Sequence, residues 1–263
     1  MISNRALDGD LFENNFIKKL NSNKNNSYWR DMGFEKNKDL FFVKVYGNKK
    51  STLNEKKIKP KTDVYLFKQN ISKNELEKID YFFDEKNNNY NFDNFIKGSG
   101  ISLKMNNAKS IQVDKCSVNK FEKRFGSKEL FFGLTIYTSE VSDLKKNFNV
   151  LKATNLKWND IADYFSIDKF NEINFNTKFD QDYKKIFKSI HKISKKKIEN
   201  TLLNNADLFN SLFTGINEFA EPYCASWLLK DGKLTKEIPD PKKIQITKGS
   251  SNGGKSPQVS FKL

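Results

Sequence analysis

Two short apolar segments carry an acid and a lysine of the kind that phosphodiester hydrolysis requires. Asp63 opens the run DVYLF, directly after Pro60-Lys61-Thr62, and Lys104 ends the run GISLK, two residues beyond Ser102. Metal-assisted hydrolysis needs a carboxylate at a strand end, a second oxygen ligand for the ion, and a cation near the attacking water and the phosphate. We therefore expect the two segments to be neighbouring strands that bring Asp63 and Lys104 together.

A second carboxylate comes from the N-terminal segment. Residues 7–20, LDGDLFENNFIKKL, have apolar side chains at three- to four-residue spacing, which predicts an amphipathic helix. Glu13 falls within the apolar face, where a carboxylate needs a partner or a metal ion to offset its desolvation. Glu13 is therefore a further candidate ligand, and the alternative is an ordinary helix residue at the edge of that face.

The single histidine and the two cysteines exclude other chemistries. Nucleases that work through paired imidazoles need more than one histidine, and His191 lies in a lysine-rich helix where we expect a solvated side chain. Cys116 and Cys224 do not form the paired motif of a zinc site or a disulfide framework. No N-terminal apolar leader and no membrane-spanning run is present, so we expect a soluble cytoplasmic protein without a membrane partner.

Hydrophobic patterning predicts the elements that position these groups. Ser72 and Glu75 form a capping box for a helix that ends near Phe83. Strands and further helices follow from alternation and from three- to four-residue spacing. The predicted strands cover residues 40–46, 63–67, 100–104 and 109–113. The predicted helices cover 118–125, 142–150, 156–165, 181–204 and 208–219, and the run LFFGLTIY is ambiguous. Two C-terminal hairpins are predicted, one across Asp231-Gly232 and one flanking KGSSNGGKSP.

These elements predict an α/β (mixed α+β) protein with a central mixed sheet flanked by helices, plus C-terminal helices and a β-hairpin. Residues 1–140 would form the catalytic core, and residues 141–263 a helical and hairpin DNA-binding extension of the same globular unit. The segment 68–97 must then be an excursion between two adjacent strands.

Charge favours a polyanionic partner. The chain has 47 Lys and Arg against 32 Asp and Glu, a net charge of +15, which suits nucleic acid; the alternative is a merely Lys- and Asn-rich composition. Polar and basic residues beside the two strands and in the C-terminal hairpin are candidates for contacts to phosphates or base edges. These candidates are Lys61, Asn106, Asn107, Lys109, Gln112, Lys115, Lys248, Ser250, Ser251, Asn252 and Lys255.

PKTDVYLF followed by GISLK resembles the split PD…(D/E)xK signature of type II restriction endonucleases, and in particular the MspI-like branch. In that branch a polar, non-acidic residue also stands two positions before the lysine, as Ser102 does here. A helix glutamate near the N-terminus joins its metal site, and GDLFENN is similar to that helix, with Glu13 as the glutamate. The C-terminal KGSSNGGKSPQVSFKL is similar to the hairpin that ends such enzymes.

The resemblance implies a restriction-endonuclease-like core and Mg²⁺-dependent, site-specific cleavage of double-stranded DNA that leaves 5′-phosphate and 3′-hydroxyl ends. Asp63 and Glu13, with the carbonyl of Leu103, are expected to hold Mg²⁺, and Lys104 to act on the attacking water. Ser102 belongs to the same catalytic set, but a hydroxyl cannot replace an anionic ligand.

Several alternatives stay open. Asp114 or Glu122 could supply the missing negative charge in place of Glu13. Lys44 with Asp39 is a competing acid–lysine pair. The chain could instead be a repair or recombination nuclease of the same fold, or a non-catalytic nucleic-acid-binding protein. A restriction enzyme implies a cognate DNA methyltransferase as functional partner, and a palindromic target suits a homodimer, although small enzymes of this kind also act as monomers.

Overall fold

The chain forms two compact units whose segments alternate along the sequence. The computed structural model describes residues 4–23, 26–34, 39–53, 56–84, 91–104, 111–135, 181–236, 238–251 and 256–263. The first unit comprises Met1–Lys109 and Asn210–Ile238, and the second comprises Ser110–Phe209 and Pro239–Leu263. This division differs from the predicted boundary near residue 140, because the chain leaves the first unit near residue 109 and returns to it near residue 210.

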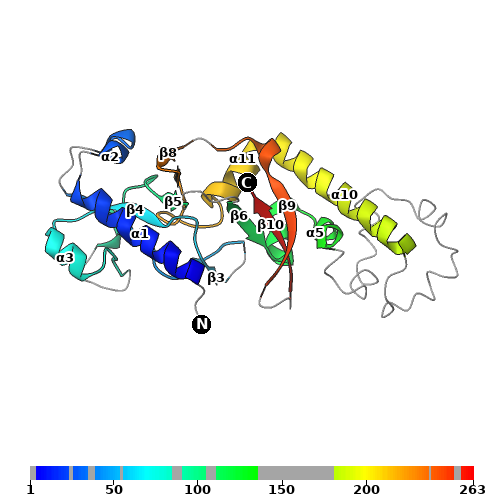
Figure 1. Cartoon of the computed structure of the whole chain (residues 1–263), viewed down its shortest axis with the longest axis horizontal. Coiled ribbons are helices and arrows are strands. Elements are labelled where there is room, and N and C mark those ends of the chain that lie inside the picture. Colours follow the sequence, from blue (N-terminus) through cyan, green and yellow to red (C-terminus); the bar gives the residue numbers. More distant parts are fainter. Residues whose placement is uncertain are drawn as a thin grey trace. The chain divides into compact units, whose positions relative to one another are not determined.

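A mixed sheet forms the centre of the first unit (Figure 1). The strand order is β1-β4-β5-β7-β8; β5 and β7 are parallel, and every other neighbouring pair is antiparallel. The strands are β1 (Leu40–Lys44), β4 (Val64–Lys68), β5 (Ile101–Leu103), β7 (Trp227–Lys230) and β8 (Lys233–Thr235). The predicted strands at 40–46, 63–67 and 100–104 and the hairpin across Asp231-Gly232 are therefore confirmed, as is the mixed α+β class.

Helix α1 (Asn4–Ser22) packs on this sheet through the apolar face that the sequence predicts. Phe16, Ile17 and Leu20 are buried in the core of the unit. The end of the helix is tied to β1 by two reciprocal bonds: Asn21 Nδ2 donates to the carbonyl of Phe42 (2.8 Å), and the Phe42 N–H donates to Asn21 Oδ1 (2.9 Å). Buried amide bonds of this kind fix the helix in register against the strand.

The segment between β4 and β5 is the excursion that the adjacent strands require. It contains α3 (Lys73–Lys78) and the short 3-10 helix η1 (Phe92–Asn94). The predicted capping box is present, with Ser72 Oγ accepting from the Glu75 N–H and Glu75 Oε2 accepting from the Ser72 N–H. The helix ends at Lys78, with Ile79 as its C-cap, before the predicted end near Phe83, because Asp80 and Tyr81 have positive φ angles of 50° and 56°.

Shorter elements complete the first unit. Helix α2 (Ser27–Asp31) follows α1, and β2 (Lys49–Lys50) and β3 (Lys57–Ile58) form a small antiparallel hairpin. Gly100 lies where the chain enters β5, and a Cβ there would lie 2.1 Å from the carbonyl oxygen of Cys224. Only glycine therefore permits β5 to approach this segment so closely.

The second unit combines a three-stranded antiparallel sheet with helices. Its strand order is β6-β10-β9, and the C-terminal hairpin is the predicted one. The elements are β6 (Gln112–Cys116), α4 (Val118–Phe125), α5 (Lys128–Thr135), α10 (Gln181–Asn204), η2 (Pro241–Lys243), β9 (Gln245–Ser251) and β10 (Ser256–Lys262), with α11 (Ala206–Thr214) continuing into the first unit. The strand predicted at 109–113 corresponds to β6, which spans Gln112–Cys116.

Two helix predictions for this unit are confirmed. Residues 118–125 and 181–204 are helical as expected, and the ambiguous apolar run falls largely within α5. Helix α11 ends before the predicted 219 because Gly215 has a φ of +75°. The helices predicted at 142–150 and 156–165 lie outside the described residues. None of the described helices is both long and apolar enough to cross a bilayer.

Candidate active site

Asp63 is held against the end of β5. Its backbone N–H donates to the carbonyl of Ile101 (2.9 Å), and its carboxylate Oδ2 accepts the backbone N–H of Leu103 (2.7 Å). The residue is 7% exposed. One carboxylate oxygen is thus used to join the two strands, and the short charge-assisted bond fixes the orientation of the carboxyl group.

Lys104 reaches Asp63 through Ser102. Alternate residues of a strand point to the same face, and the ammonium of Lys104 donates to Ser102 Oγ at 2.8 Å. Ser102 Oγ in turn lies 3.5 Å from Asp63 Oδ2, at the limit of a hydrogen bond. The hydroxyl of Ser102 therefore positions the lysine beside the carboxylate and does not act as an anionic group itself.

Glu13 meets the same cluster from α1, and a lysine outside the predicted set stands between the two acids. Lys59 Nζ is 3.7 Å from Glu13 Oε1 and 3.7 Å from Asp63 Oδ1. The side chain of Glu13 is 23% exposed, whereas that of Lys59 is 69% exposed. Glu13, Asp63 and Lys104 therefore gather around one location, although they come from three distant parts of the chain.

The carboxylates of this cluster repel each other. Burial raises the pKa of Glu13, the Asp63 carboxylate raises it further, and Lys59 and Lys104 offset only part of the shift. Burial alone would lower the pKa of Lys59, but the carboxylates of Asp63 and Glu13 outweigh burial and leave this pKa raised. The ionised form of Glu13 is therefore costly, and an added cation would stabilise it.

The donor set fits a magnesium ion with few protein ligands. No group of three or more His, Cys, Asp or Glu side chains in the described part of the chain is arranged to hold a metal. Mg²⁺ is, however, commonly held by one or two carboxylates together with substrate phosphates and water. The N–H of Leu103 faces Asp63, and the carbonyl of a strand residue points to the same side as its N–H. Leu103 can thus add a carbonyl oxygen to the two acids.

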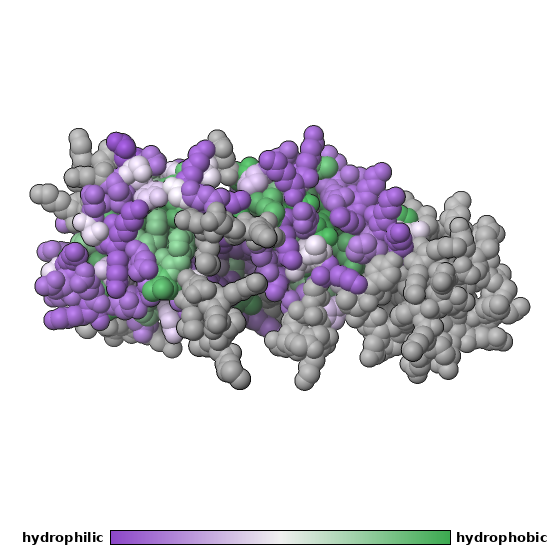
Figure 2. Space-filling view, in the orientation of Figure 1, coloured by the Kyte–Doolittle hydropathy of each residue, from purple (hydrophilic) through white to green (hydrophobic). Residues whose placement is uncertain are grey.

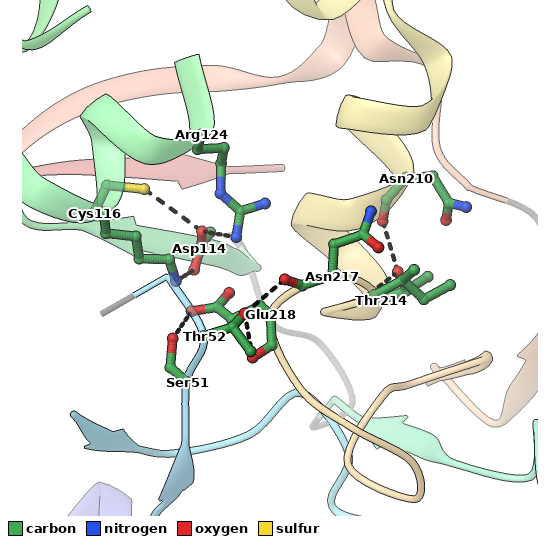
Figure 3. Close-up of polar contacts among 11 residues, drawn as sticks. Ser51, Thr52, Asp114, Cys116, Arg124, Asn210, Thr214, Asn217 and Glu218 are labelled. Carbon is green, nitrogen blue, oxygen red and sulfur yellow. Dashed lines mark hydrogen bonds and ion pairs between the residues drawn. The ribbon is translucent and has the colours of Figure 1, made fainter. Parts of the chain in front are cut away.

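The alternative acids, Asp114 and Glu122, belong to the second unit. The carboxylate of Asp114 binds Lys120 Nζ (2.8 Å) and Arg124 Nη2 (3.3 Å); Figure 3 shows the Arg124 contact. Glu122 is exposed on α4 of that unit. Lys44 contacts Asn14 and the carboxylate of Asp80, so its ion pair is with an acid other than the predicted Asp39.

The predicted DNA-contacting residues have varied environments. Gln112, Lys115 and Lys248 are exposed on the sheet of the second unit. Lys61 is half-buried, and a Cβ at Gly215 would lie 2.6 Å from its Cγ, so the stem of Lys61 packs against this turn. Ser250 and Ser251 lie in β9. The remaining candidates, Asn106, Asn107, Lys109, Asn252 and Lys255, lie outside the described residues.

Helix α10 adds a basic surface to the second unit. Lys188, Lys192 and Lys196 are exposed, and in the view of Figure 2 hydrophilic side chains cover most of the described part of this helix. His191 is half-buried, contrary to the expected solvated side chain, because its Nδ1 lies 2.9 Å from the carbonyl oxygen of Leu134. Burial lowers the pKa of His191, which favours the neutral ring.

Comparison of the chain with models of protein families, with curated proteins and with solved structures gave no match. The functional assignment therefore depends on the geometry of the site. Sequence reasoning missed Lys59, although it lies four residues before Asp63 in the basic segment KIKPKTD. Only its distances to the Glu13 and Asp63 carboxylates in the folded chain distinguish this lysine from its neighbours.

Proposed function

We propose that the protein is a Mg²⁺-dependent endonuclease of the PD-(D/E)xK kind that acts as a type II restriction enzyme on double-stranded DNA. The observation that carries this proposal is the convergence of Asp63, Glu13 and Lys104, which are joined by Lys59 and Ser102 into one polar cluster. The sequence offers no local reason for these residues to meet, whereas a phosphodiester-cleaving centre needs all three.

The mixed sheet supports a restriction-endonuclease-like core. Asp63 stands at the start of β4 and Lys104 directly after β5, and these strands are neighbours in spite of the long segment between them. Because β4 and β5 are antiparallel, the start of one lies beside the end of the other. The acid and the lysine therefore lie at the same end of this strand pair, as the PD…(D/E)xK resemblance requires.

Each residue of the cluster has a distinct task in the proposed reaction. Asp63, Glu13 and the carbonyl of Leu103 would hold Mg²⁺, which when bound supplies Lewis-acid stabilisation and a more acidic water. The ammonium of Lys104 orients the attacking water and stabilises negative charge that develops on the phosphate. Ser102 accepts a hydrogen bond from Lys104 and keeps it in place. In-line attack would leave 5′-phosphate and 3′-hydroxyl ends.

The charge of the chain suits the proposed substrate. A net charge of +15 and the exposed lysines of α10 and β9 favour contact with the phosphate backbone. We propose that the DNA is contacted by Lys61, Gln112, Lys115 and Lys248. A cognate DNA methyltransferase is the implied functional partner, and a symmetric dimer is one arrangement for reading a palindrome.

Digestion of a sequenced plasmid in the presence and absence of Mg²⁺, followed by mapping of the fragment ends, tests this function. Discrete fragments with one common end sequence support a restriction enzyme, and nicking that depends on DNA structure supports the repair-nuclease alternative. Lys104→Ala should lower the cleavage rate about 10²- to 10³-fold while DNA is still bound. Metal-independent binding without cutting on any DNA would leave a nucleic-acid-binding protein, and full activity of Lys104→Ala would discard the assigned chemistry.

A further inference from the structure

Lys59 occupies an unusual position for an exposed lysine. Its ammonium is equally distant, at 3.7 Å, from one oxygen of Glu13 and one oxygen of Asp63. These are the two carboxylates that the proposed function assigns to the metal. The ammonium therefore stands where it neutralises the same pair of negative charges that a divalent cation would bind.

The backbone that carries Lys59 is anchored. Lys59 directly follows β3, and the β2–β3 hairpin is bound to the segment 217–223 of the same unit. Figure 3 shows two of these contacts: Ser51 Oγ donates to Glu218 Oε1 (3.1 Å), and Thr52 Oγ1 donates to the carbonyl of Asn217 (2.7 Å).

Two further contacts hold the hairpin. The backbone N–H of Thr52 donates to the carbonyl of Glu218 (3.0 Å), and the ammonium of Lys49 lies 4.6 Å from the centroid of the Tyr223 ring. The carboxyl-bearing side chain of Glu218 is fully buried. These anchors fix the backbone at the start of the 59–63 segment, and they therefore keep the Lys59 side chain close to the two carboxylates.

We propose that Lys59 is a built-in counter-cation that holds Glu13 and Asp63 together in the metal-free protein and competes with the divalent ion for them. This inference rests on the proposed function, since it concerns the same two carboxylates. The ammonium contacts each acid at ion-pair distance and not at hydrogen-bond distance, and most of its side chain is exposed to solvent. It can therefore move into solvent when the metal ion enters.

The competition has a measurable consequence. An ion pair of a solvent-exposed lysine shifts an equilibrium by about one- to fivefold, and Lys59, whose own side chain is largely exposed, makes two such contacts with the same site. Removal of the Lys59 charge should therefore tighten divalent-ion binding about three- to tenfold. If Lys59 served only to hold the loop, removal of its charge would weaken divalent-ion binding or leave it unchanged, because a loosened site binds metal more weakly.

The test is titration of the DNA-free protein with Mn²⁺, followed by the electron paramagnetic resonance signal of the free ion. We expect Lys59→Gln to lower the Kd for Mn²⁺ about three- to tenfold relative to the unmodified chain. Lys59→Arg keeps the charge and should keep the original Kd. Lys57→Gln removes the same charge from an exposed neighbour on β3 and should change the Kd less than about twofold.

Equal Kd values for Lys59→Gln and the unmodified chain would overturn the inference. An equal decrease in the Kd of Lys59→Gln and Lys57→Gln would also overturn it, because the effect would then be one of net charge alone. Absence of Mn²⁺ binding in every variant would also overturn it. Plasmid cleavage in Mg²⁺, measured on the same preparations, separates the two claims: cleavage with an unchanged Kd leaves the proposed function standing and removes only the role of Lys59.

Discussion

The two units each contain a cluster of acids and bases, and the clusters are built in opposite ways. In the second unit one buried acid, Asp114, lies between two buried cations, Lys120 and Arg124, and all three side chains are at most 3% exposed. In the first unit two acids, Glu13 and Asp63, face each other, and the lysine that contacts both is largely exposed.

The difference is the one expected between a structural cluster and the metal site that we propose. The cluster of Asp114 satisfies its carboxylate within the protein, and such buried pairs depend on every member for stability. In the first unit, by contrast, burial raises the pKa of Glu13, and repulsion by the Asp63 carboxylate raises it further. A carboxyl group with a shifted pKa and a specific charged neighbour, as Glu13 is, marks a candidate functional site.

Asp114→Ala should have the largest effect on stability. It leaves the ammonium of Lys120 and the guanidinium of Arg124 buried without their shared carboxylate, and the loss of one partner from a buried ion pair costs about 3–5 kcal/mol. Urea denaturation followed by circular dichroism measures this loss. A decrease below about 1 kcal/mol would show that the cluster of the second unit is not structural.

Gly100→Ala should disturb both stability and activity in the first unit. The added Cβ would lie 2.1 Å from the carbonyl oxygen of Cys224 and 2.7 Å from Thr62 Oγ1, so β5 must shift. We expect a loss of about 1–3 kcal/mol in unfolding free energy and about a hundredfold loss of cleavage, because Ser102 and Lys104 move with the strand. Gly9→Ala is the control, since a Cβ at Gly9 has no atom within 4 Å. Unchanged cleavage in Gly100→Ala would break the link between strand position and site.

Glu13→Gln should stabilise the protein while it weakens the proposed metal site. Burial and the Asp63 carboxylate raise the pKa of Glu13 above its value in the unfolded chain, 4.5, so the folded state binds the proton more tightly. Ionisation therefore costs stability at neutral pH, and the cost disappears as the pH falls through the raised pKa toward 4.5. We expect a gain of about 0.5–1 kcal/mol at pH 7 to 8. Thermal unfolding across pH measures it, and a loss of stability at neutral pH would contradict the argument.

Local patterns predicted most elements of the fold. The apolar face of α1, the capping box of α3, the strands around Asp63 and Ser102 and both C-terminal hairpins follow from spacing and turn residues, which act over a few positions. The interleaved division into units was not predictable in this way, because the return of the chain at residue 210 depends on long-range pairing of β7 with β5. The end of α3 was also missed: Asp80 and Tyr81 have positive φ angles, and both residues contact Lys44 of β1, which is distant in the sequence.

The site was predictable only in part. The sequence indicated Glu13, Asp63, Ser102 and Lys104 through residue type and resemblance, and the structure brings these residues together. It did not indicate Lys59, one of 47 basic residues, because its selection depends on the anchoring of the β2–β3 hairpin to a segment more than a hundred positions away. Such a contact leaves no mark on the spacing of neighbouring residues.

Cleavage by Asp63→Asn shows whether the cluster of Glu13, Asp63 and Lys104 is a metal-dependent catalytic centre. The amide can still accept the Leu103 N–H, so the fold should persist, but the anionic charge that the proposed metal centre needs is lost. In Mg²⁺ we predict cleavage of plasmid DNA at least about a hundredfold slower than by the unmodified chain, with DNA binding and melting temperature unchanged. Cleavage at the full rate by the folded Asp63→Asn protein would contradict the account.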